Sequence, residues 1–174
     1  TLTALPLSPK AVPFHPKKMN LQQYDEWCQY PLFVITKVIE YLQHKHSIVL
    51  SPFSITIDSS QFYLKPKTKL GLGSSAAVTV SIITLLFQWC EKETDNLEIF
   101  FLACSCYREF QKVPASGIDI ASTLWPGWME YSAPEKFFTF HELLQINDFS
   151  KVSKPYIHHF TVSPSLHFMA VYLK

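Results

Sequence analysis

Glycine is scarce in this chain: only 4 of its 174 residues are glycine, whereas average usage of about 7% would give roughly 12. Gly71 and Gly73 lie in one short stretch, and Gly117 and Gly127 lie in another. The 12 prolines and the polar residues therefore have to form most of the turns. A chain that uses so little glycine should keep it where no other residue fits, so both stretches are candidate functional sites.

Cysteine and charge are also limited. Four cysteines are too few for a disulfide scaffold and indicate a reducing compartment, here the cytoplasm. Cys104 and Cys106 have no second ligand pair at zinc-site spacing, so a metal or redox pair is the minor alternative to two buried thiols. With 17% charged residues and a net charge of +1, the chain lacks the basic stripe of a duplex-binding protein, and no nucleic-acid partner is predicted.

Apolar residues are plentiful, at 48% of the chain with 15% aromatic, which excludes global disorder and predicts one domain over residues 1–174. Residues 70–90 carry no charge, but hydroxyls recur among them and only about 78–89 is truly apolar. This pattern favours a buried helix over the alternative of a membrane span. The chain starts without Met and ends inside a strand-like run, so we expect it to be part of a longer protein.

Periodicity and turn signals give a coarse order of elements. Asp95 is an expected helix cap, with Glu98 completing a capping box. The predicted elements are an extended segment over 1–18, a helix from Pro31 to about Lys45, strand structure over Ile48–Ile57, a loop over 58–68, a helix over the uncharged segment, a helix from Asp95 to about Lys112, a turn-rich segment over 113–128, and strands over Tyr131–Phe140 and Tyr156–Leu173.

The first glycine stretch predicts an anion site. Gly71 and Gly73 directly precede a long helix, and glycine lets the backbone approach a ligand closely. The helix N-terminus presents unpaired N–H groups and partial positive charge, which suits phosphate. Ser74 and Ser75 add hydroxyls that can also reach Mg²⁺, and Lys69 can bring a mobile positive charge. The alternative is a glycine-containing loop whose serines merely cap a core helix.

The second stretch supplies a carboxylate. Asp119 follows Ser116 and Gly117, and we expect it to be partly buried at a loop-to-helix junction. It could accept or orient a substrate proton in phosphoryl transfer, or it could simply be a helix N-cap. Gly127 indicates a turn that ends this segment.

Together the two stretches resemble the GHMP kinases, which include galactokinase, homoserine kinase, mevalonate kinase and phosphomevalonate kinase. Residues 71–77 resemble the family's second signature motif, and residues 116–119 resemble the Ser-Gly-x-Asp that carries its catalytic aspartate. The resemblance covers roughly residues 48–131. The phosphomevalonate branch fits best, on residues 55–60, residues 69–80 and Gln111. The mevalonate branch is the alternative, although Arg108 occupies the place of its Mg²⁺-binding glutamate.

This resemblance implies an α+β fold, in which residues 1–174 are a partial N-terminal ATP-binding domain like domain 2 of ribosomal protein S5, truncated at both ends. It implies transfer of the γ-phosphoryl group of ATP, with Mg²⁺, to a small phosphorylated substrate, 5-phosphomevalonate. The implied roles are triphosphate binding by Gly71, Leu72, Gly73, Ser74, Ser75 and Ala76, Mg²⁺ binding by Ser75, catalysis by Asp119 and Lys69, and substrate binding by Ser116 and Gly117.

Departures from the family pattern leave other functions open. The Pro-Gly-Lys strand, the third glycine-rich motif and the second lobe of the family have no counterpart in the sequence, and Tyr107 and Ala115 replace a typical histidine and glycine. The chain is therefore either a piece of a longer kinase or the product of a degraded gene. A non-catalytic relative that senses a nucleotide or metabolite, and a domain without a ligand, are the other functional alternatives. By itself the 174-residue chain is expected to show no turnover.

Overall fold

The computed structural model describes residues 2–5, 8–13, 15, 20–60, 63–65, 68–69 and 73–163. The strands are β1 (Leu2–Leu5), β2 (Ser8–Val12), β3 (Ile55–Asp58), β4 (Tyr63–Lys65), β5 (Thr68–Lys69), β6 (Met129–Ser132) and β7 (Tyr156–His159). The helices are α1 (Glu26–His46), α2 (Ser74–Trp89), α3 (Asn96–Gln111), α4 (Ile118–Leu124) and α5 (Phe140–Gln145), with 3-10 turns η2 (Leu21–Gln23) and η4 (Phe149–Lys151).

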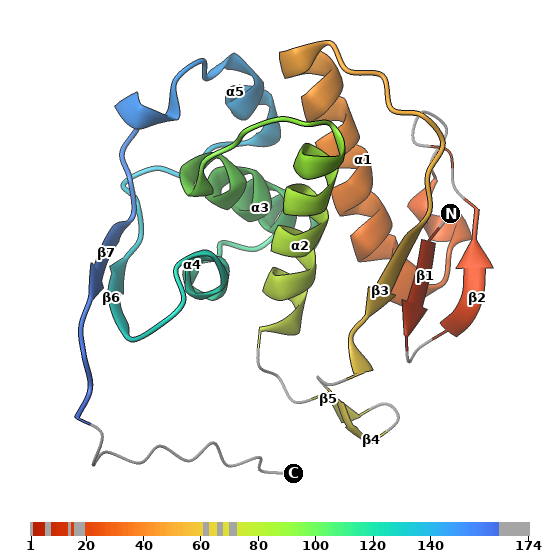
Figure 1. Ribbon diagram of the computed structural model, residues 1–174, viewed down its shortest axis with the longest axis horizontal. Coiled ribbons are helices and arrows are strands. Elements are labelled where there is room, and N and C mark those ends of the chain that lie inside the picture. The colour runs from red at the N-terminus through yellow and green to blue at the C-terminus, as the bar shows by residue number, and fades with distance from the viewer. Residues whose placement is uncertain are drawn as a thin grey trace.

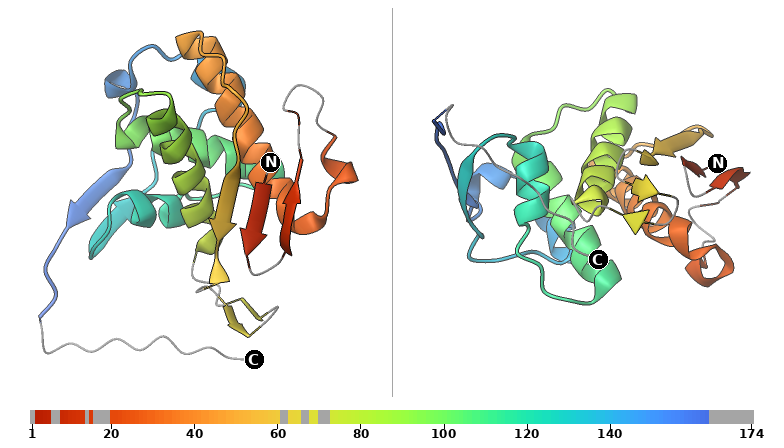
Figure 2. Two further views of the ribbon diagram at one scale, coloured as in Figure 1. Left: turned by 45° about the vertical axis from the view of Figure 1, so that its right-hand side comes forward. Right: turned by 90° about the horizontal axis from the view of Figure 1, so that it is seen from below.

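The helices lie between two small β structures (Figures 1 and 2). On one side a sheet has the order β2-β1-β3. Its parallel pair, β1 and β3, is joined through α1 and aligns Leu2 with Ile55. On the other side β6 pairs antiparallel with β7. The helices thus share one core that both β structures border, as an α+β fold requires.

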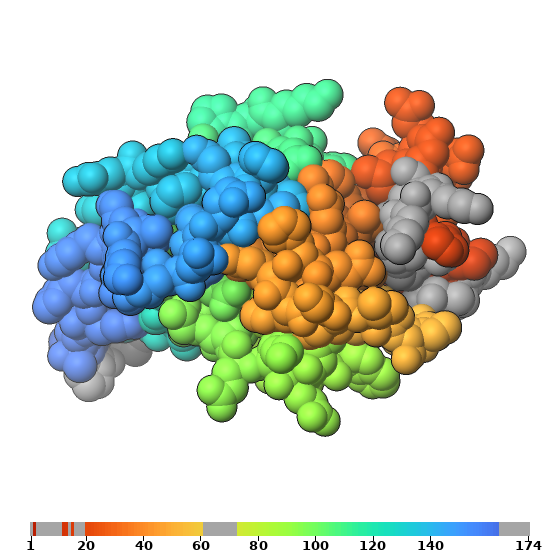
Figure 3. All heavy atoms as spheres, turned by 90° about the horizontal axis from the view of Figure 1, so that it is seen from above, coloured from red at the N-terminus to blue at the C-terminus, as the bar shows by residue number. Residues whose placement is uncertain are grey.

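The core forms where α1, α2 and α3 bring their apolar faces together. Tyr41, Phe87, Phe100 and Phe101 are its largest fully buried side chains. They form two ring pairs, Tyr41 with Phe87 at a tilted angle and Phe100 with Phe101 edge to face, with centroids 6.1 Å and 5.3 Å apart. Both are favourable arrangements for aromatic rings. Seen from above, the end of α1 lies beside the α5 segment, where Lys45 donates to the Ile146 carbonyl (Figure 3).

Helix α1 begins earlier than predicted. It starts at Glu26, so Pro31 lies inside the helix rather than at its start. The proline costs one i→i−4 hydrogen bond, but extending the helix across it buries Cys28 on one side and Leu32 on the other. Tertiary burial therefore outweighs the local signal of the proline.

Several predicted strand and loop boundaries were also wrong. Within Ile48–Ile57 only the last residues join a strand, β3, and the predicted loop over 58–68 contains the short pair β4 and β5. The predicted strand over Tyr131–Phe140 ends at Ser132, and Phe140 begins α5 instead. Of the last predicted strand, Tyr156–His159 is observed as β7, and residues 164–174 lie outside the described residues.

The cap of α3 is confirmed, but the capping box is not completed. The Asp95 carboxylate accepts from the Glu98 N–H at 2.8 Å. The Glu98 carboxylate accepts from Tyr41 at 2.7 Å and from Thr94 at 2.8 Å. Glu98 therefore ties α3 to α1, a tertiary use that the local motif does not reveal.

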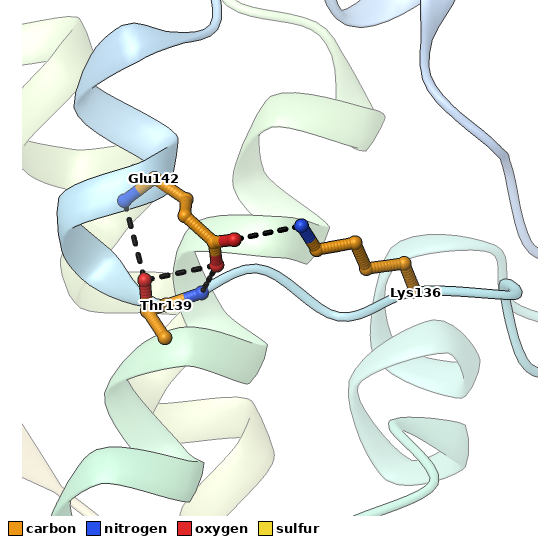
Figure 4. Close-up of polar contacts among 3 residues, drawn as sticks. All are labelled: Lys136, Thr139 and Glu142. Atoms are coloured by element: carbon orange, nitrogen blue, oxygen red, sulfur yellow. Dashed lines mark hydrogen bonds and ion pairs between the residues drawn. The ribbon is translucent and has the colours of Figure 1, made fainter.

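A complete capping box starts α5 (Figure 4). The Glu142 N–H donates to the Thr139 hydroxyl at 3.2 Å, and the Glu142 carboxylate accepts from the Thr139 N–H at 2.8 Å. Lys136 also donates to that carboxylate, at 2.7 Å. These donors lower the pKa of Glu142 from 4.5 to about 2, and the hydrogen bond from Lys136 has the largest effect.

The cap should make stability depend on pH. Because the pKa of Glu142 is lowered by folding, its contribution is present above about pH 4.5 and is lost as the pH falls toward 2. We expect urea unfolding to show a difference between the native chain and Glu142→Gln that is constant from about pH 7 to 5 and shrinks at lower pH. A difference that stays constant down to about pH 3 would contradict the role of the ionised carboxylate.

No helix among the described residues has both the length and the apolar composition needed to cross a membrane. The uncharged segment forms α2, whose 16 residues start at Ser74 and pack Ile83 and Phe87 into the core.

Candidate functional site

Helix α2 starts at the predicted anion site. Gly73 is its N-cap, with φ +70°, and the Gly73 carbonyl accepts from the Ala77 N–H at 3.1 Å. This left-handed conformation suits glycine because it has no Cβ. No side chain of a described residue caps the helix start, and the first N–H groups of a helix have no intrahelical partners. The site is therefore arranged to offer donors and partial positive charge to an anion.

Ser74 gives a second indication of a ligand at this place. Its side chain is almost fully buried, at 4% exposure, yet its hydroxyl has no hydrogen-bond partner among the described residues. An unsatisfied buried hydroxyl costs about 1–3 kcal/mol. A phosphate oxygen bound at the helix N-terminus would satisfy the hydroxyl, so the residues present fit an anionic group.

Asp119 lies in the first turn of α4, one residue beyond the helix start. The N-cap is Gly117, with φ +78°, so the alternative of Asp119 as a helix cap is wrong. Asp119 is also exposed rather than partly buried. Because Gly117 takes the cap position, the Asp119 carboxylate is not needed by the helix, and it has no hydrogen-bond or ion-pair partner among the residues that the structure describes.

The two glycine stretches meet in space. A Cβ placed on Gly73 would lie 3.8 Å from Asp119 Cγ and 3.9 Å from its Oδ1, and α4 lies beside the start of α2 (Figure 1). Between them is a cavity of about 400 Å³. The predicted site residues that line this cavity are Gly73, Ser74, Ser75, Ala76, Ser116, Gly117 and Asp119. Gly71 and Leu72 lie outside the described residues, and of Lys69 only the backbone, in β5, is described.

Two side chains from neighbouring elements fix the loop that leads to Asp119. The Arg108 guanidinium, on α3, donates to the Ala115 carbonyl at 3.1 Å. The Tyr131 hydroxyl, on β6, donates to the Ser116 carbonyl, and partial burial raises the pKa of Tyr131 to about 12. Since both carbonyls belong to the loop wall of the cavity, Arg108 and Tyr131 hold that wall in place.

Removing the tyrosine hydroxyl should loosen this wall. Tyr131→Phe leaves the Ser116 carbonyl without its side-chain donor, and we expect a loss of about 1 kcal/mol in the free energy of unfolding, measured in urea. Tyr156→Phe is the matched control, because Tyr156 lies on β7 and is 52% exposed. Equal stability of the two variants would show that the Tyr131 contact contributes nothing.

Two hydroxyls, those of Thr79 on α2 and Tyr30 on α1, support the first turn of α2. The Thr79 hydroxyl donates to the Ser75 carbonyl at 2.7 Å, and the Tyr30 hydroxyl lies 2.7 Å from Thr79 Oγ1. Thr79 is fully buried, and burial raises the pKa of Tyr30 well above its usual range. Helix α1 therefore holds the segment that carries Ser74 and Ser75.

These supporting residues were not predicted. The sequence marks Arg108 only as a replacement for a glutamate of the family, and it marks Tyr107, which lines the cavity, only as a replacement for a histidine. No local signal marks Tyr30, Thr79 or Tyr131, because their contacts arise from helix and strand packing.

The cysteine pair on α3 is buried. Burial raises the pKa of Cys104 and raises that of Cys106 to about 12, which favours the protonated thiols of buried core cysteines. No group of three or more metal-ligating side chains occurs in the described part of the chain.

The chain shares sequence with a known family and with a curated relative. The family model for the GHMP kinases N terminal domain matches residues 34–127. A phosphomevalonate kinase from Streptomyces sp. strain CL190 is 35% identical over 85 residues, which are 49% of this chain and 22% of that protein. The matched part of the chain thus covers about a fifth of the length of this curated relative. The predicted family and its phosphomevalonate branch as the best match are confirmed.

Two solved structures share the fold. Streptococcus pneumoniae phosphomevalonate kinase in complex with phosphomevalonate and AMPPNP superposes with a TM-score of 0.62 and 18% identity over 81% of this chain and 42% of that one. The Lin0012 protein from Listeria innocua superposes with a TM-score of 0.71 and 22% identity over 92% of this chain and 45% of that one. The predicted α+β lobe is confirmed.

Proposed function

Because the chain belongs to the GHMP kinase family, we propose that residues 1–174 are an N-terminal ATP-binding domain that serves transfer of the γ-phosphoryl group of ATP to 5-phosphomevalonate. The observation that carries the proposal is the meeting of the α2 N-terminus with Asp119 in one cavity. One element supplies donors for a polyphosphate, and the other supplies a carboxylate for the acceptor. Phosphoryl transfer requires mainly this positioning and charge stabilisation.

The residues divide into two groups by their place in the cavity. Gly73, Ser74, Ser75 and Ala76, at the start of α2, are proposed to hold the triphosphate, with Gly71 and Leu72 preceding them in the chain. The Ser74 hydroxyl is a buried donor without a partner among the described residues. Lys69 is proposed to add positive charge near the phosphates. Mg²⁺ would be held by Ser75 and would neutralise phosphate charge when bound.

Asp119 is the proposed catalytic carboxylate. It stands at the other wall of the cavity, close to Gly73, with no partner among the described residues that would compete for it. There it can accept a proton from the acceptor or orient its attacking oxygen. Ser116 and Gly117, on the same wall, are proposed to contact the acceptor.

The choice of acceptor rests on the relatives. The curated relative is a phosphomevalonate kinase, and the solved phosphomevalonate kinase binds phosphomevalonate and AMPPNP. Arg108 also supports this branch over the mevalonate branch. It bonds to the Ala115 carbonyl, and a cation at this place is no substitute for a glutamate that binds Mg²⁺.

The test is a coupled assay of ADP release by the gene product that carries residues 1–174. With Mg-ATP, we expect turnover with 5-phosphomevalonate and at least tenfold lower kcat/KM with mevalonate. The reverse preference would assign the protein to the mevalonate branch. Stabilisation by Mg-ATP in a thermal shift without turnover on either acceptor would indicate a non-catalytic nucleotide-binding relative.

A further inference from the structure

A second cavity, of about 330 Å³, lies between α3 and the segment that leads into α5. Its walls are Phe137, Phe138 and Phe140 on one side and Ser105, Arg108 and Glu109 on the other. It shares none of its described lining residues with the proposed kinase site. Its volume is at the lower end of the range for small-molecule sites, about 300–1,000 Å³.

Ser105 is an unpartnered polar group in this cavity. The residue is 3% exposed, and its hydroxyl has no hydrogen-bond partner among the described residues. A buried serine on a helix would ordinarily be satisfied or replaced by alanine, since an unsatisfied hydroxyl destabilises the fold. The hydroxyl therefore indicates a ligand atom that accepts a hydrogen bond.

Arg108 supplies a cation to the same cavity. Its guanidinium stacks on Phe137, 4.7 Å from the ring centroid, and uses one N–H for the Ala115 carbonyl. The nearby carboxylates are already paired, Glu109 with Lys37 at 2.8 Å and Glu142 with Lys136 at 2.7 Å. Among the described residues Arg108 has no carboxylate partner, which leaves its remaining donors for an anion.

We propose that this cavity is a second ligand site, which binds a small aromatic carboxylate. The ring would lie among the three phenylalanines, the carboxylate would pair with Arg108, and Ser105 would donate to it. Because Lys37 neutralises Glu109, the acidic side chain at the wall does not repel the ligand. No residue of the α2 N-terminus takes part, and the binding test does not depend on kinase activity. Arg108 serves both sites, because it also donates to the Ala115 carbonyl at the wall of the first cavity.

Benzoate is the probe for this site, and benzamide is its neutral counterpart. In a titration of the ¹⁵N-labelled 174-residue chain, we expect benzoate to shift the amide signals of Ser105 and Phe138 saturably, with a Kd of about 1 mM. Benzamide should bind at least tenfold more weakly, because it cannot form the ion pair with Arg108. Ser105→Val should weaken benzoate binding about tenfold, because it removes the donor and fills space. Ser81→Val, on the exposed face of α2, is the matched control and should bind as the native chain does.

Three results would overturn the proposal. The first is the lack of a saturable shift up to about 20 mM benzoate. The second is equal affinity for benzoate and benzamide, and the third is unchanged benzoate binding by Ser105→Val. If valine disturbs the fold, as judged by the dispersion of the amide spectrum, Ser105→Ala takes its place. This variant adds no volume, so unchanged affinity would again overturn the role of the hydroxyl.

Discussion

Replacing Asp119 with asparagine is expected to lower kcat of the gene product on the order of 10³-fold while Mg-ATP affinity stays within about threefold. Asparagine keeps the shape of the side chain but can neither accept a proton nor carry a negative charge. The carboxylate lies in the cavity, close to Gly73 at the start of α2. The loss should therefore appear in the chemical step rather than in nucleotide binding.

Asp119→Asn should leave the stability of the fold unchanged, so its effect on kcat can be ascribed to the chemical step. The Asp119 side chain is exposed and has no partner among the described residues, and only its backbone carbonyl is used, accepting from Ser122 and Thr123 at 2.9 Å each. Asparagine leaves that carbonyl in place. We thus expect an unchanged midpoint of urea unfolding, so that a lower kcat cannot be ascribed to loss of folded protein.

Glu130→Gln is the matched control for Asp119→Asn. Glu130 is an exposed carboxylate on β6, and it does not line the cavity. Its substitution should leave kcat within about twofold of the native value. Native turnover by Asp119→Asn would remove Asp119 from catalysis. A large loss of Mg-ATP affinity in this variant would instead make the carboxylate part of nucleotide binding.

The two glycine stretches could be predicted to meet special backbone requirements, because few other residues adopt a positive φ. Gly73 and Gly117 both adopt positive φ, and each is the N-cap of the helix that carries a predicted functional residue. The sequence could not show that Asp119 would lie opposite Gly73, because that contact depends on how α4 packs against α2. Family resemblance supplied the link that local patterns lack.

The fold was predictable where one local signal dominates. Asp95 begins α3 as its cap chemistry requires. Prediction failed where tertiary burial competes with a local signal, as at Pro31, which lies inside α1. It also failed at Phe140, where an aromatic run that suggests a strand is followed by the Thr139 capping box of a helix. In both places the helix buries apolar side chains, Cys28 in α1 and Phe140 in α5.

Gly117→Ala should destabilise the fold by about 3 kcal/mol, since two costs act at this position. The positive φ of +78° costs a residue with a Cβ roughly 1–2 kcal/mol. The new Cβ would also lie 3.0 Å from both Cys104 Sγ and Phe100 Cζ. Phe100 is fully buried and Cys104 nearly so, so neither side chain has space to withdraw, and such overpacking costs about 1–3 kcal/mol. Urea unfolding measures the sum.

Gly73→Ala separates the two costs. Gly73 has a similar φ of +70°, but the nearest described atoms to its new Cβ, on Asp119, are 3.8 Å away, an ordinary contact distance. We expect a loss of only about 1–2 kcal/mol, from backbone strain alone. The difference between the two losses in free energy of unfolding thus measures the cost of placing a Cβ at Gly117, where α4 lies close to α3. Equal losses would mean that Phe100 and Cys104 move aside, and that the sequence keeps Gly117 for its backbone conformation only.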